Sequence, residues 1–241
     1  MTSSELPALD VLAIAAHPDD IEQTCGGTLI KMAALGYRAG ALDLTAGDMG
    51  TRGTPELRIE ESQTAARHML LAWRGNLRMP DARLENTLAA QLTVAAKIRE
   101  LRPRVVILPY WEARHPDHYR AGELAYEGCF LAGLKKLDES TAPHRPFKAI
   151  YSSLYANVAP SFVVDISEEF ERRMAALLSY ESQYGGGEAS DLFPGAGQIR
   201  ERLEAVARFY GNLIGVKYGE PFVVKETMRV DDVVALDVRS F

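Results

Sequence analysis

Cysteine is scarce in this sequence. Its 241 residues include two, Cys25 and Cys129, which lie far apart and form no C-x-x-C pair. A disulfide framework is therefore excluded as the basis of the fold, and a reducing compartment is expected. No run approaches the roughly 18 apolar residues that span a bilayer, and residues 1–5 carry no basic segment of the kind that begins a signal peptide. We therefore expect a soluble, cytoplasmic protein without a membrane partner.

Basic charge is not in excess either. The 27 Lys and Arg residues are outnumbered by 33 Asp and Glu, which gives a net charge of −6. A nucleic-acid partner would need a basic surface, so none is expected. The G-x-G-x-x-G, G-x-x-x-x-G-K and G-x-S-x-G motifs are also absent where a parallel-sheet enzyme would carry them. These absences argue against a nucleotide-binding oxidoreductase, a P-loop protein and a serine hydrolase.

The apolar pattern indicates a single α/β domain over residues 1–241. Short apolar runs typical of buried strands alternate with helical segments four times before residue 135, which predicts a mostly parallel sheet with right-handed crossovers. The predicted strands are 9–16, 38–44, 76–79 and 105–108, and the helices between them are 29–35, 55–71 and 87–101. Thr28 is expected to cap the first helix, Gly36 to end it, and Pro55 to begin the second.

The part of the chain after about residue 150 is less regular. It is expected to add strands at 150–155 and 162–165 and helices at 167–184 and 199–213. Residues 185–197 are rich in glycine, and whether they act as a lid stays open.

Unusual polar residues gather in the four loops that follow the predicted strands. The loops are 17–20, 47–53, 80–81 and 112–118. Because open α/β sheets bind ligands at the carboxyl ends of their strands, we expect one shared site there.

Histidine and carboxylate side chains in the first and last of these loops suggest a metal. Two histidines and a carboxylate, with a water in the remaining position, are the ligands of a catalytic zinc site. The same donors also suit iron or manganese. The neighbours Asp19 and Asp20 would point in different directions, so that one binds the metal and the other faces its water. A lone His-Pro-Asp is commonly only a turn, but the sequence has two, at His17 and His115.

The remaining candidates have simpler interpretations. His68 lies inside a predicted helix and is expected at the surface or in packing, and His144 is a loop residue. Cys25 and Cys129 are expected to be small buried packing residues.

These motifs resemble the LmbE-like, or PIG-L, deacetylase family. Residues 16–22 with 25–28 are similar to its first motif and residues 115–118 to its second. Residues 50–58, 80–86, 160–167, 180–183 and 218–222 resemble in particular the branch that makes bacillithiol, the N-acetylglucosaminyl-malate deacetylases.

The resemblance implies a Rossmann-like fold and a mononuclear zinc hydrolase that removes an N-acetyl group from an N-acetylglucosamine unit. It assigns His17, Asp20 and His118 as metal ligands, Zn²⁺ being expected and Fe²⁺ or another divalent ion being an alternative. It makes Asp19 the general base, His115 the imidazolium that steadies the oxyanion, and Asp117 the residue that orients His115. The group that protonates the leaving amine stays open between Asp19 and His115.

The resemblance also bears on the substrate and the assembly. It links Arg58 and Arg114 to substrate binding, and Arg52 is a further candidate for the carboxylates of a malate conjugate. Relatives often form homo-oligomers such as hexamers, and several carry an active-site tyrosine in the segment corresponding to residues 191–199, where this sequence has none.

Three alternatives remain at this point. The same chemistry could act on diacetylchitobiose, an N-acetylglucosaminyl lipid or a mercapturic-type thiol conjugate. The chain could instead be a non-catalytic carbohydrate-binding protein, or a nucleotide-binding oxidoreductase, which the missing glycine motif disfavours.

Overall fold

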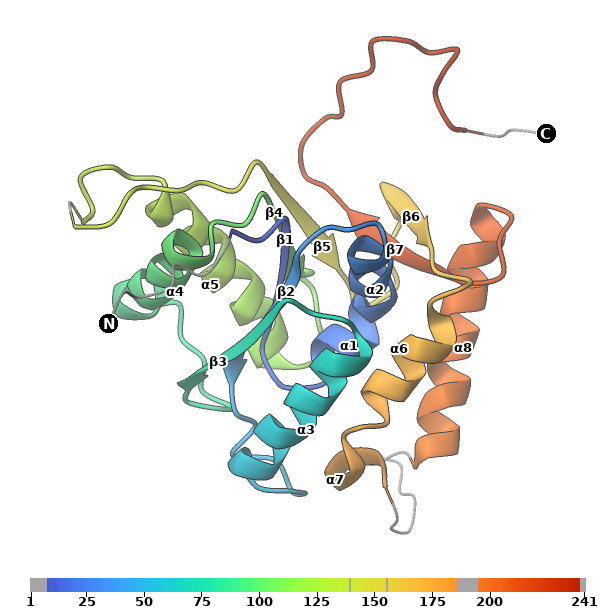
Figure 1. Cartoon of the computed structure of the whole chain (residues 1–241), viewed down its shortest axis with the longest axis horizontal. Helices are drawn as coiled ribbons and strands as arrows, with labels where there is room; N and C mark the ends of the chain where they lie inside the picture. Colours follow the sequence, from blue (N-terminus) through green and yellow to red (C-terminus); the bar gives the residue numbers. More distant parts are fainter. Residues whose placement is uncertain (1–7, 139, 155, 186–194, 239–241) are drawn as a thin grey trace.

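A seven-stranded sheet organises the chain, of which the computed structural model describes residues 8–138, 140–154, 156–185 and 195–238 (Figure 1). Its strand order is β3-β2-β1-β4-β5-β7-β6. The strands are β1 (Val11–Ala15), β2 (Ala39–Thr45), β3 (Trp73–Met79), β4 (Val105–Pro109), β5 (Lys148–Ser152), β6 (Phe162–Asp165) and β7 (Gly219–Val223). The first five strands in that order pair in parallel, and β7 is antiparallel to both β5 and β6. The expected Rossmann-like, mostly parallel α/β fold is confirmed.

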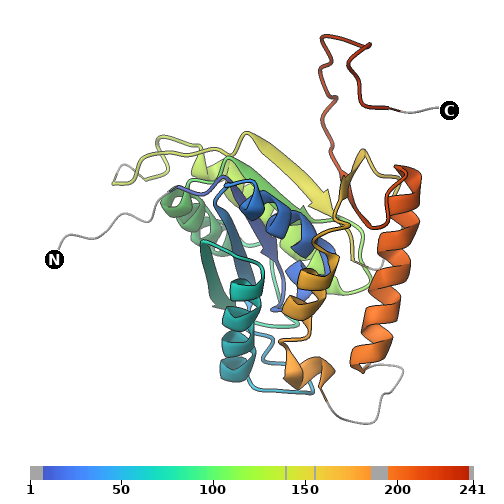
Figure 2. The ribbon, with the colours of Figure 1, turned by 45° about the vertical axis from the view of Figure 1, so that its right-hand side comes forward.

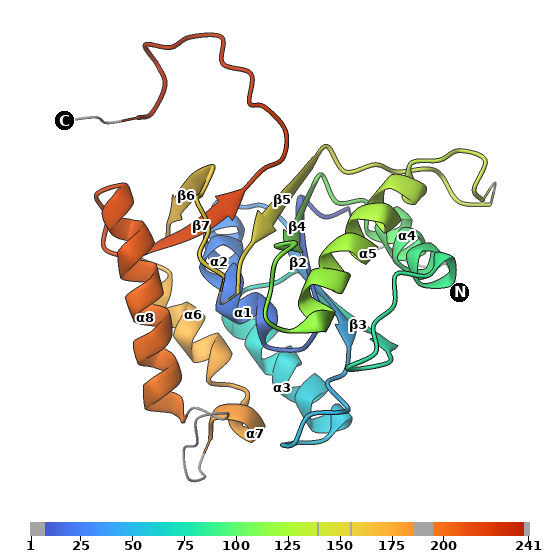
Figure 3. The same ribbon diagram turned by 180° about the vertical axis from the view of Figure 1, so that it is seen from behind.

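Helices cover both faces of the sheet. They are α1 (Asp20–Thr24), α2 (Gly26–Ala34), α3 (Pro55–His68), α4 (Leu88–Leu101), α5 (Pro116–Ala132), α6 (Phe170–Leu177), α7 (Glu181–Tyr184) and α8 (Ala196–Leu213). Figures 2 and 3 show α4 and α5 on one face and α2, α3 and α6 on the other, with α8 beyond α6. Side chains alternate along a strand, so Val11 and Ala13 of β1 join one hydrophobic core and Leu12 and Ile14 the other.

Local signals place several helix ends correctly. The Thr54 hydroxyl accepts the N–H of Leu57 (3.2 Å) just before Pro55, and the Thr87 hydroxyl caps α4 by accepting the N–H of Ala90 (3.3 Å). Gly36 follows α2 at a φ of 89°, a left-handed conformation that glycine adopts without strain.

The prediction that Thr28 caps the first helix is wrong. The helix begins at Gly26, and a residue of β7 caps it instead: the Glu220 carboxylate accepts the N–H groups of Gly27 (2.8 Å) and Thr28 (2.7 Å) and the Thr28 hydroxyl (2.6 Å). The cap comes from a strand about 190 residues later, which no local pattern could indicate.

The predicted helix 167–184 is two helices, α6 and α7. The chain leaves the helical conformation at Tyr180 (φ −82°, ψ 68°), whose hydroxyl donates to the buried carboxylate of Glu22 at 3.1 Å. This tertiary bond fixes the break.

Other boundaries also differ from the predictions. The third and fifth strands begin earlier than predicted, at Trp73 and Lys148; Tyr155, and with it the predicted end of the fifth strand, lies outside the described residues. The last helix begins at Ala196 rather than Ile199, and β7 was not predicted at all. The possible lid at 185–197 lies mostly outside the described residues. No helix in the described part of the chain is both long enough and apolar enough to span a membrane.

Candidate active site and metal centre

Three side chains converge where β1 and β4 end. His17 follows β1, Asp20 begins α1, and His118 lies in the first turn of α5. Their ligand atoms all lie within 4.8 Å of one another. His17 Nδ1 lies 3.3 Å from Asp20 Oδ2 and 3.3 Å from His118 Nε2, and His118 Nε2 lies 3.3 Å from Asp20 Oδ1.

The topology explains this meeting. β1 and β4 are parallel neighbours, so the loops after them lie at the same edge of the sheet. Pro18 ends the first extended segment, and the turn that follows is closed by Asp20, whose carboxylate accepts the N–H of His17 at 2.9 Å. Pro116 begins α5, so His118 lies in the first turn of the helix that follows β4.

The charges of the group suit a cation. Burial opposes ionisation of Asp20, but His118 and His17 hold the pKa of this carboxyl well below its usual range. Burial likewise works against a charged His17, but contacts with Asp117, Asp20 and Asp81 raise its pKa well above the usual value. A metal ion at Nδ1 would displace the proton from that nitrogen. Two imidazole nitrogens and an ionised carboxylate oxygen are a donor set that zinc accepts, so these residues fit a divalent metal.

A second carboxylate holds the far side of the His17 ring. Asp81 Oδ1 lies 3.0 Å from His17 Nε2, and Asp81 itself accepts the N–H groups of Met49 (2.7 Å) and Ala82 (2.8 Å). Although burial opposes ionisation, the bond with His17 helps lower the pKa of Asp81 to about 2. The sequence predicted this loop but no role for Asp81, and the position of Asp81 after the third strand was the available signal.

Asp19 is held in an unusual conformation beside the donor group, as we call the side chains of His17, Asp20 and His118. Its φ of 99° is left-handed, a strained state for a residue with a side chain, and such strain is concentrated at functional sites. Oδ2 accepts the Tyr184 hydroxyl at 2.7 Å, and Oδ1 lies 3.4 Å from Arg58 Nη2. Burial raises the pKa of Asp19 to about 6, with Arg58 opposing the rise.

The three arginines predicted to bind substrate lie in different settings. Arg58 is buried and donates to the carbonyl oxygens of Pro18 (2.6 Å) and Gly47 (3.5 Å), so it braces the Asp19 turn. Arg52 donates to the carbonyl of Gln183 at 3.2 Å. Arg114 is exposed and lines a groove of about 590 Å³.

This groove runs from the candidate metal site toward α8. It shares Thr24 and Leu154 with a small cavity lined by Asp20 and His118. Arg202, an exposed residue of α8, also lines it. A substrate bound at the donor group therefore has room for a further chemical group beside two exposed arginines, Arg114 and Arg202.

His115 and Asp117 are linked differently from the expectation. The Asp117 carboxylate lies 3.5 Å from His17 Nε2 and accepts the N–H of Leu84 at 3.3 Å, so its closest partner ring is His17, not His115. His115 Nδ1 accepts the backbone N–H of Asp117 at 3.2 Å. Burial, with His17 and His118 nearby, lowers the pKa of His115. The backbone bond leaves the proton of a neutral His115 ring on Nε2. The role of Asp117 in orienting His115 stays a prediction.

A buried ionic network that the sequence did not indicate lies beneath the site. Arg74 of β3 contacts Glu22 of α1 and bonds both carboxylate oxygens of Asp43 of β2, at 3.0 and 3.1 Å. All three side chains are buried. The network therefore links α1, which begins with Asp20, to strands β2 and β3 of the sheet.

The sequence did not indicate a role for Tyr184 either. Several relatives carry an active-site tyrosine in the segment corresponding to residues 191–199, and this sequence has none there. Residues 191–194 of that segment lie outside the described part of the chain. Tyr184 comes from the preceding helix α7, and its hydrogen bond to Asp19 crosses 165 positions of sequence, so no local signal indicated it.

The other candidates are structural. His68 is exposed, and His144 Nε2 lies 2.7 Å from the carbonyl oxygen of Pro103. Cys25 and Cys129 are buried, and burial raises the pKa of each thiol to about 12, which makes both inert.

The fold and the site define a class of protein: a Rossmann-like α/β protein with a His–Asp–His group that could hold a metal and a strained carboxylate beside it. The family model described as PIG-L, GlcNAc-PI de-N-acetylase, matches residues 12–129. Diacetylchitobiose deacetylase of Thermococcus kodakarensis is 31% identical over 223 residues, covering 87% of this chain and 80% of that protein.

Two further proteins are similar. The crystal structure of the conserved protein TT1542 from Thermus thermophilus superposes with a TM-score of 0.83 at 41% identity, covering 92% of this chain and 98% of that one. A Bacillus anthracis protein named "Probable N-acetyl-alpha-D-glucosaminyl L-malate deacetylase 2" is 29% identical over 188 residues, covering 72% of this chain and 81% of that protein. The chain belongs to the PIG-L, or LmbE-like, family, and it is an N-deacetylase, a hydrolase of carbon–nitrogen bonds.

Proposed function

We propose that this chain is a zinc-dependent deacetylase that removes the N-acetyl group from an N-acetylglucosamine conjugate. The observation that carries the proposal is the convergence of His17, Asp20 and His118 within 4.8 Å, with Asp19 beside them. Zinc held by these donors would lower the pKa of a water molecule and polarise the acetyl carbonyl.

Asp19 serves as the general base. Tyr184 and Arg58 fix its carboxylate, and its raised pKa brings it closer to the operating pH than an ordinary aspartate. It takes a proton from the attacking water and can return it to the leaving amine.

His115 serves as the donor to the developing oxyanion. It lies at the exposed mouth of the site, with its ring centre 5.0 Å from those of His17 and His118. Because Nδ1 accepts the Asp117 N–H, the Nε2 proton is available to the substrate. Loss of one such donor typically costs about 3 kcal/mol of transition-state stabilisation.

For the substrate we propose N-acetylglucosaminyl-malate. Arginine pairs readily with carboxylates, and the groove next to the donor group is lined by Arg114 and Arg202. The similarity to the Bacillus anthracis protein supports this choice. Diacetylchitobiose is the second candidate, because the Thermococcus kodakarensis relative carries that activity in its name.

Acetate release tests the proposal. Metal-loaded and chelator-treated protein would be assayed on N-acetylglucosaminyl-malate, diacetylchitobiose and free N-acetylglucosamine. We expect chelator-sensitive release, fastest from the malate conjugate. Absence of metal-dependent acetate from all three would refute the proposed chemistry, and preference for diacetylchitobiose would replace the proposed substrate.

Charge-removing variants test the groove. Arg114→Gln and Arg202→Gln are expected to raise KM for the malate conjugate and to leave KM for diacetylchitobiose unchanged. Arg208→Gln is the matched control, because Arg208 lies on the same helix as Arg202, is exposed and paired with Glu204 at 2.8 Å, and does not line the groove. Equal effects on both substrates would contradict carboxylate recognition.

A further inference from the structure

The short helix α7 supplies the hydroxyl that bonds Asp19, although it spans only Glu181–Tyr184. A single turn of helix does not persist in isolation, because fixing its backbone costs more than its few hydrogen bonds offset. α7 lies beside α3 at the end of the sheet (Figure 1). Contacts outside the helix must therefore set the position of α7, and with it the position of Tyr184.

Glu61 of α3 holds the first turn of α7. Its Oε1 accepts the backbone N–H of Ser182 at 2.7 Å, and its Oε2 accepts the Ser182 hydroxyl at 2.7 Å. The first N–H groups of a helix have no partner within the helix, and Tyr180, the residue before α7, makes no side-chain bond to them. The buried Glu61 carboxylate therefore takes the place of a local cap, from 121 positions earlier in the chain.

The loop before α3 fits closely against the same turn. A Cβ at Gly53 would lie 2.8 Å from the Ser182 hydroxyl oxygen, and the φ of 75° at Gly53 is left-handed. The Gln183 amide donates to the carbonyl of Arg52 at 2.9 Å, and the Arg52 guanidinium donates to the carbonyl of Gln183 at 3.2 Å. These contacts leave α7 one seat against α3 and this loop.

α3 thus reaches the two oxygens of Asp19 by two routes. Arg58 lies 3.4 Å from Oδ1 directly. Glu61 lies three residues later on the same face of α3, and it reaches Oδ2 through Ser182 and Tyr184. A movement of α7 by about 1 Å would lengthen the 2.7 Å bond between Tyr184 and Asp19 beyond hydrogen-bond range. Misplacement on this scale can cost about 10²-fold in rate.

We propose that Glu61 is a positioning residue for deacetylation: its carboxylate holds α7, and α7 holds Tyr184 against Asp19. The proposal rests on the proposed function, in which Asp19 is the general base. Glu61 acts through Ser182 rather than by contact with the reacting atoms. It gives a purpose to a buried carboxylate that the chemistry at the metal does not otherwise use.

A double-mutant cycle with Tyr184→Phe tests the proposal. Glu61→Ala is expected to lower kcat about tenfold and to leave KM and bound zinc unchanged, because it disturbs the alignment of the base. In the Tyr184→Phe background the same change should lower kcat less than twofold, since the hydroxyl through which Glu61 acts is already absent. Effects that are independent multiply. A kcat of Glu61→Ala within twofold of the wild type, or an equal loss in both backgrounds, would overturn the proposal.

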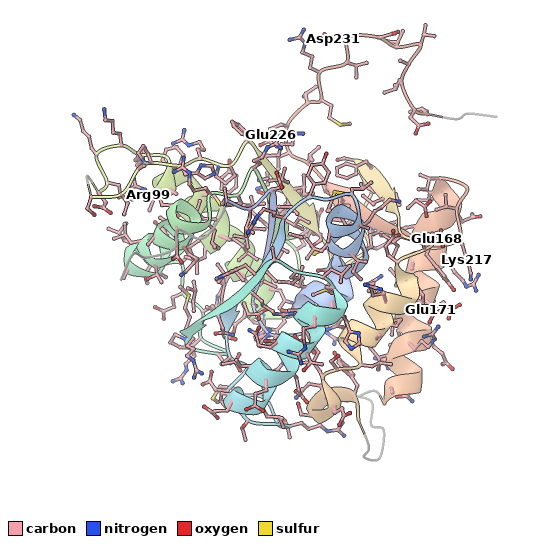
Figure 4. All side chains as sticks on the ribbon, viewed as in Figure 1. Arg99, Glu168, Glu171, Lys217, Glu226 and Asp231 are labelled. Atoms are coloured by element: carbon pink, nitrogen blue, oxygen red, sulfur yellow. The ribbon has the colours of Figure 1, made fainter. Side chains whose placement is uncertain are left out.

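Glu171→Ala is the matched control. The Glu171 carboxylate also joins two helices, by a 2.6 Å bond to Arg200 of α8, but it lies at the outer surface of α6 and 70% exposed (Figure 4). Its removal should leave kcat unchanged. If Glu61→Ala fails to fold, which circular dichroism would reveal, Ser182→Ala removes one of the two bonds. It should lower kcat about threefold in the wild type and not in Tyr184→Phe, and equal losses would again overturn the proposal.

Hydrogen–deuterium exchange tests the position of α7 without any measurement of activity. In Glu61→Ala the amides of residues 182–184 are expected to exchange at least tenfold faster, while those of β1 keep their wild-type rates. Unchanged exchange in α7 would overturn the proposal whatever the rate of acetate release. Asp19→Asn separates the two levels: full turnover by this variant would refute the proposed base, whereas a slow Asp19→Asn beside a fast Glu61→Ala would refute the positioning role alone.

Discussion

The hydroxyl of Tyr184 donates a 2.7 Å hydrogen bond to Oδ2 of Asp19. Arg58 lies 3.4 Å from the other carboxylate oxygen, and the Asp19 backbone is held at a φ of 99°. The proposed base is therefore fixed from three directions by α7, α3 and its own turn. A carboxylate with so little freedom is aligned before substrate arrives, and alignment of this kind lowers the activation barrier.

Removal of the Tyr184 hydroxyl should slow the reaction without unloading the metal. Tyr184→Phe leaves a buried carboxylate oxygen without its bond, at a cost of about 1–3 kcal/mol, so we expect kcat to fall about tenfold or more. KM and bound zinc should stay unchanged. Tyr37→Phe, at an exposed tyrosine shortly after α2, is the control. A kcat within twofold of the wild type would show that Tyr184 does not position the base.

Replacement of the base itself should have a larger effect. Asn tolerates the left-handed conformation that Asp19 adopts, so Asp19→Asn keeps the turn and removes the proton acceptor. We expect kcat to fall by about 10²–10⁴, with one zinc per chain retained in elemental analysis. Turnover at the wild-type rate would eliminate Asp19 as the base.

Asp81 should control metal affinity from outside the donor group. Its carboxylate holds His17 Nε2 at 3.0 Å, and loss of such a partner typically weakens metal binding by about 10–100-fold. Asp81→Asn is therefore expected to raise the zinc dissociation constant by that factor in a competition titration. Asp48→Asn, at an exposed aspartate of the neighbouring loop, should leave it unchanged. Equal zinc affinities for the two variants would contradict this role.

The buried network should be important for stability. Arg74→Met leaves Glu22 and Asp43 buried without their cation, which typically costs about 3–5 kcal/mol. Arg104→Met removes an exposed pair with Asp10 (3.3 Å; Arg104 63% exposed) and should cost less than about 1 kcal/mol. Urea unfolding of both variants measures the difference. Similar losses would show that the network contributes no more than a surface ion pair.

Much of this architecture follows from local sequence. The β1 run, the helix start at Pro55 and the stop at Gly36 each depend on residues within a few positions of one another, and all three are found as predicted. The meeting of His17, Asp20 and His118 follows from one topological rule, that neighbouring parallel strands end at the same edge of the sheet.

The features of the fold and the site that local sequence could not predict depend on residues far apart in the chain. The strand β7 forms because it pairs with β5 and β6, and its Glu220 caps α2 in place of Thr28. Tyr180 breaks a predicted helix to reach Glu22, 158 positions away. The orientation of Asp117 toward His17 likewise depends on where two separate loops meet in space, which spacing along the chain does not determine.

Zinc titration of metal-depleted protein tests the central claim most directly. Bound zinc and acetate release from N-acetylglucosaminyl-malate would be followed together in the wild type and in His118→Ala. Activity is expected to rise in proportion to zinc and to level off at one ion per chain in the wild type, while His118→Ala neither retains zinc nor releases acetate. Full activity in the metal-depleted wild type, or one tightly bound zinc in His118→Ala, would contradict the account.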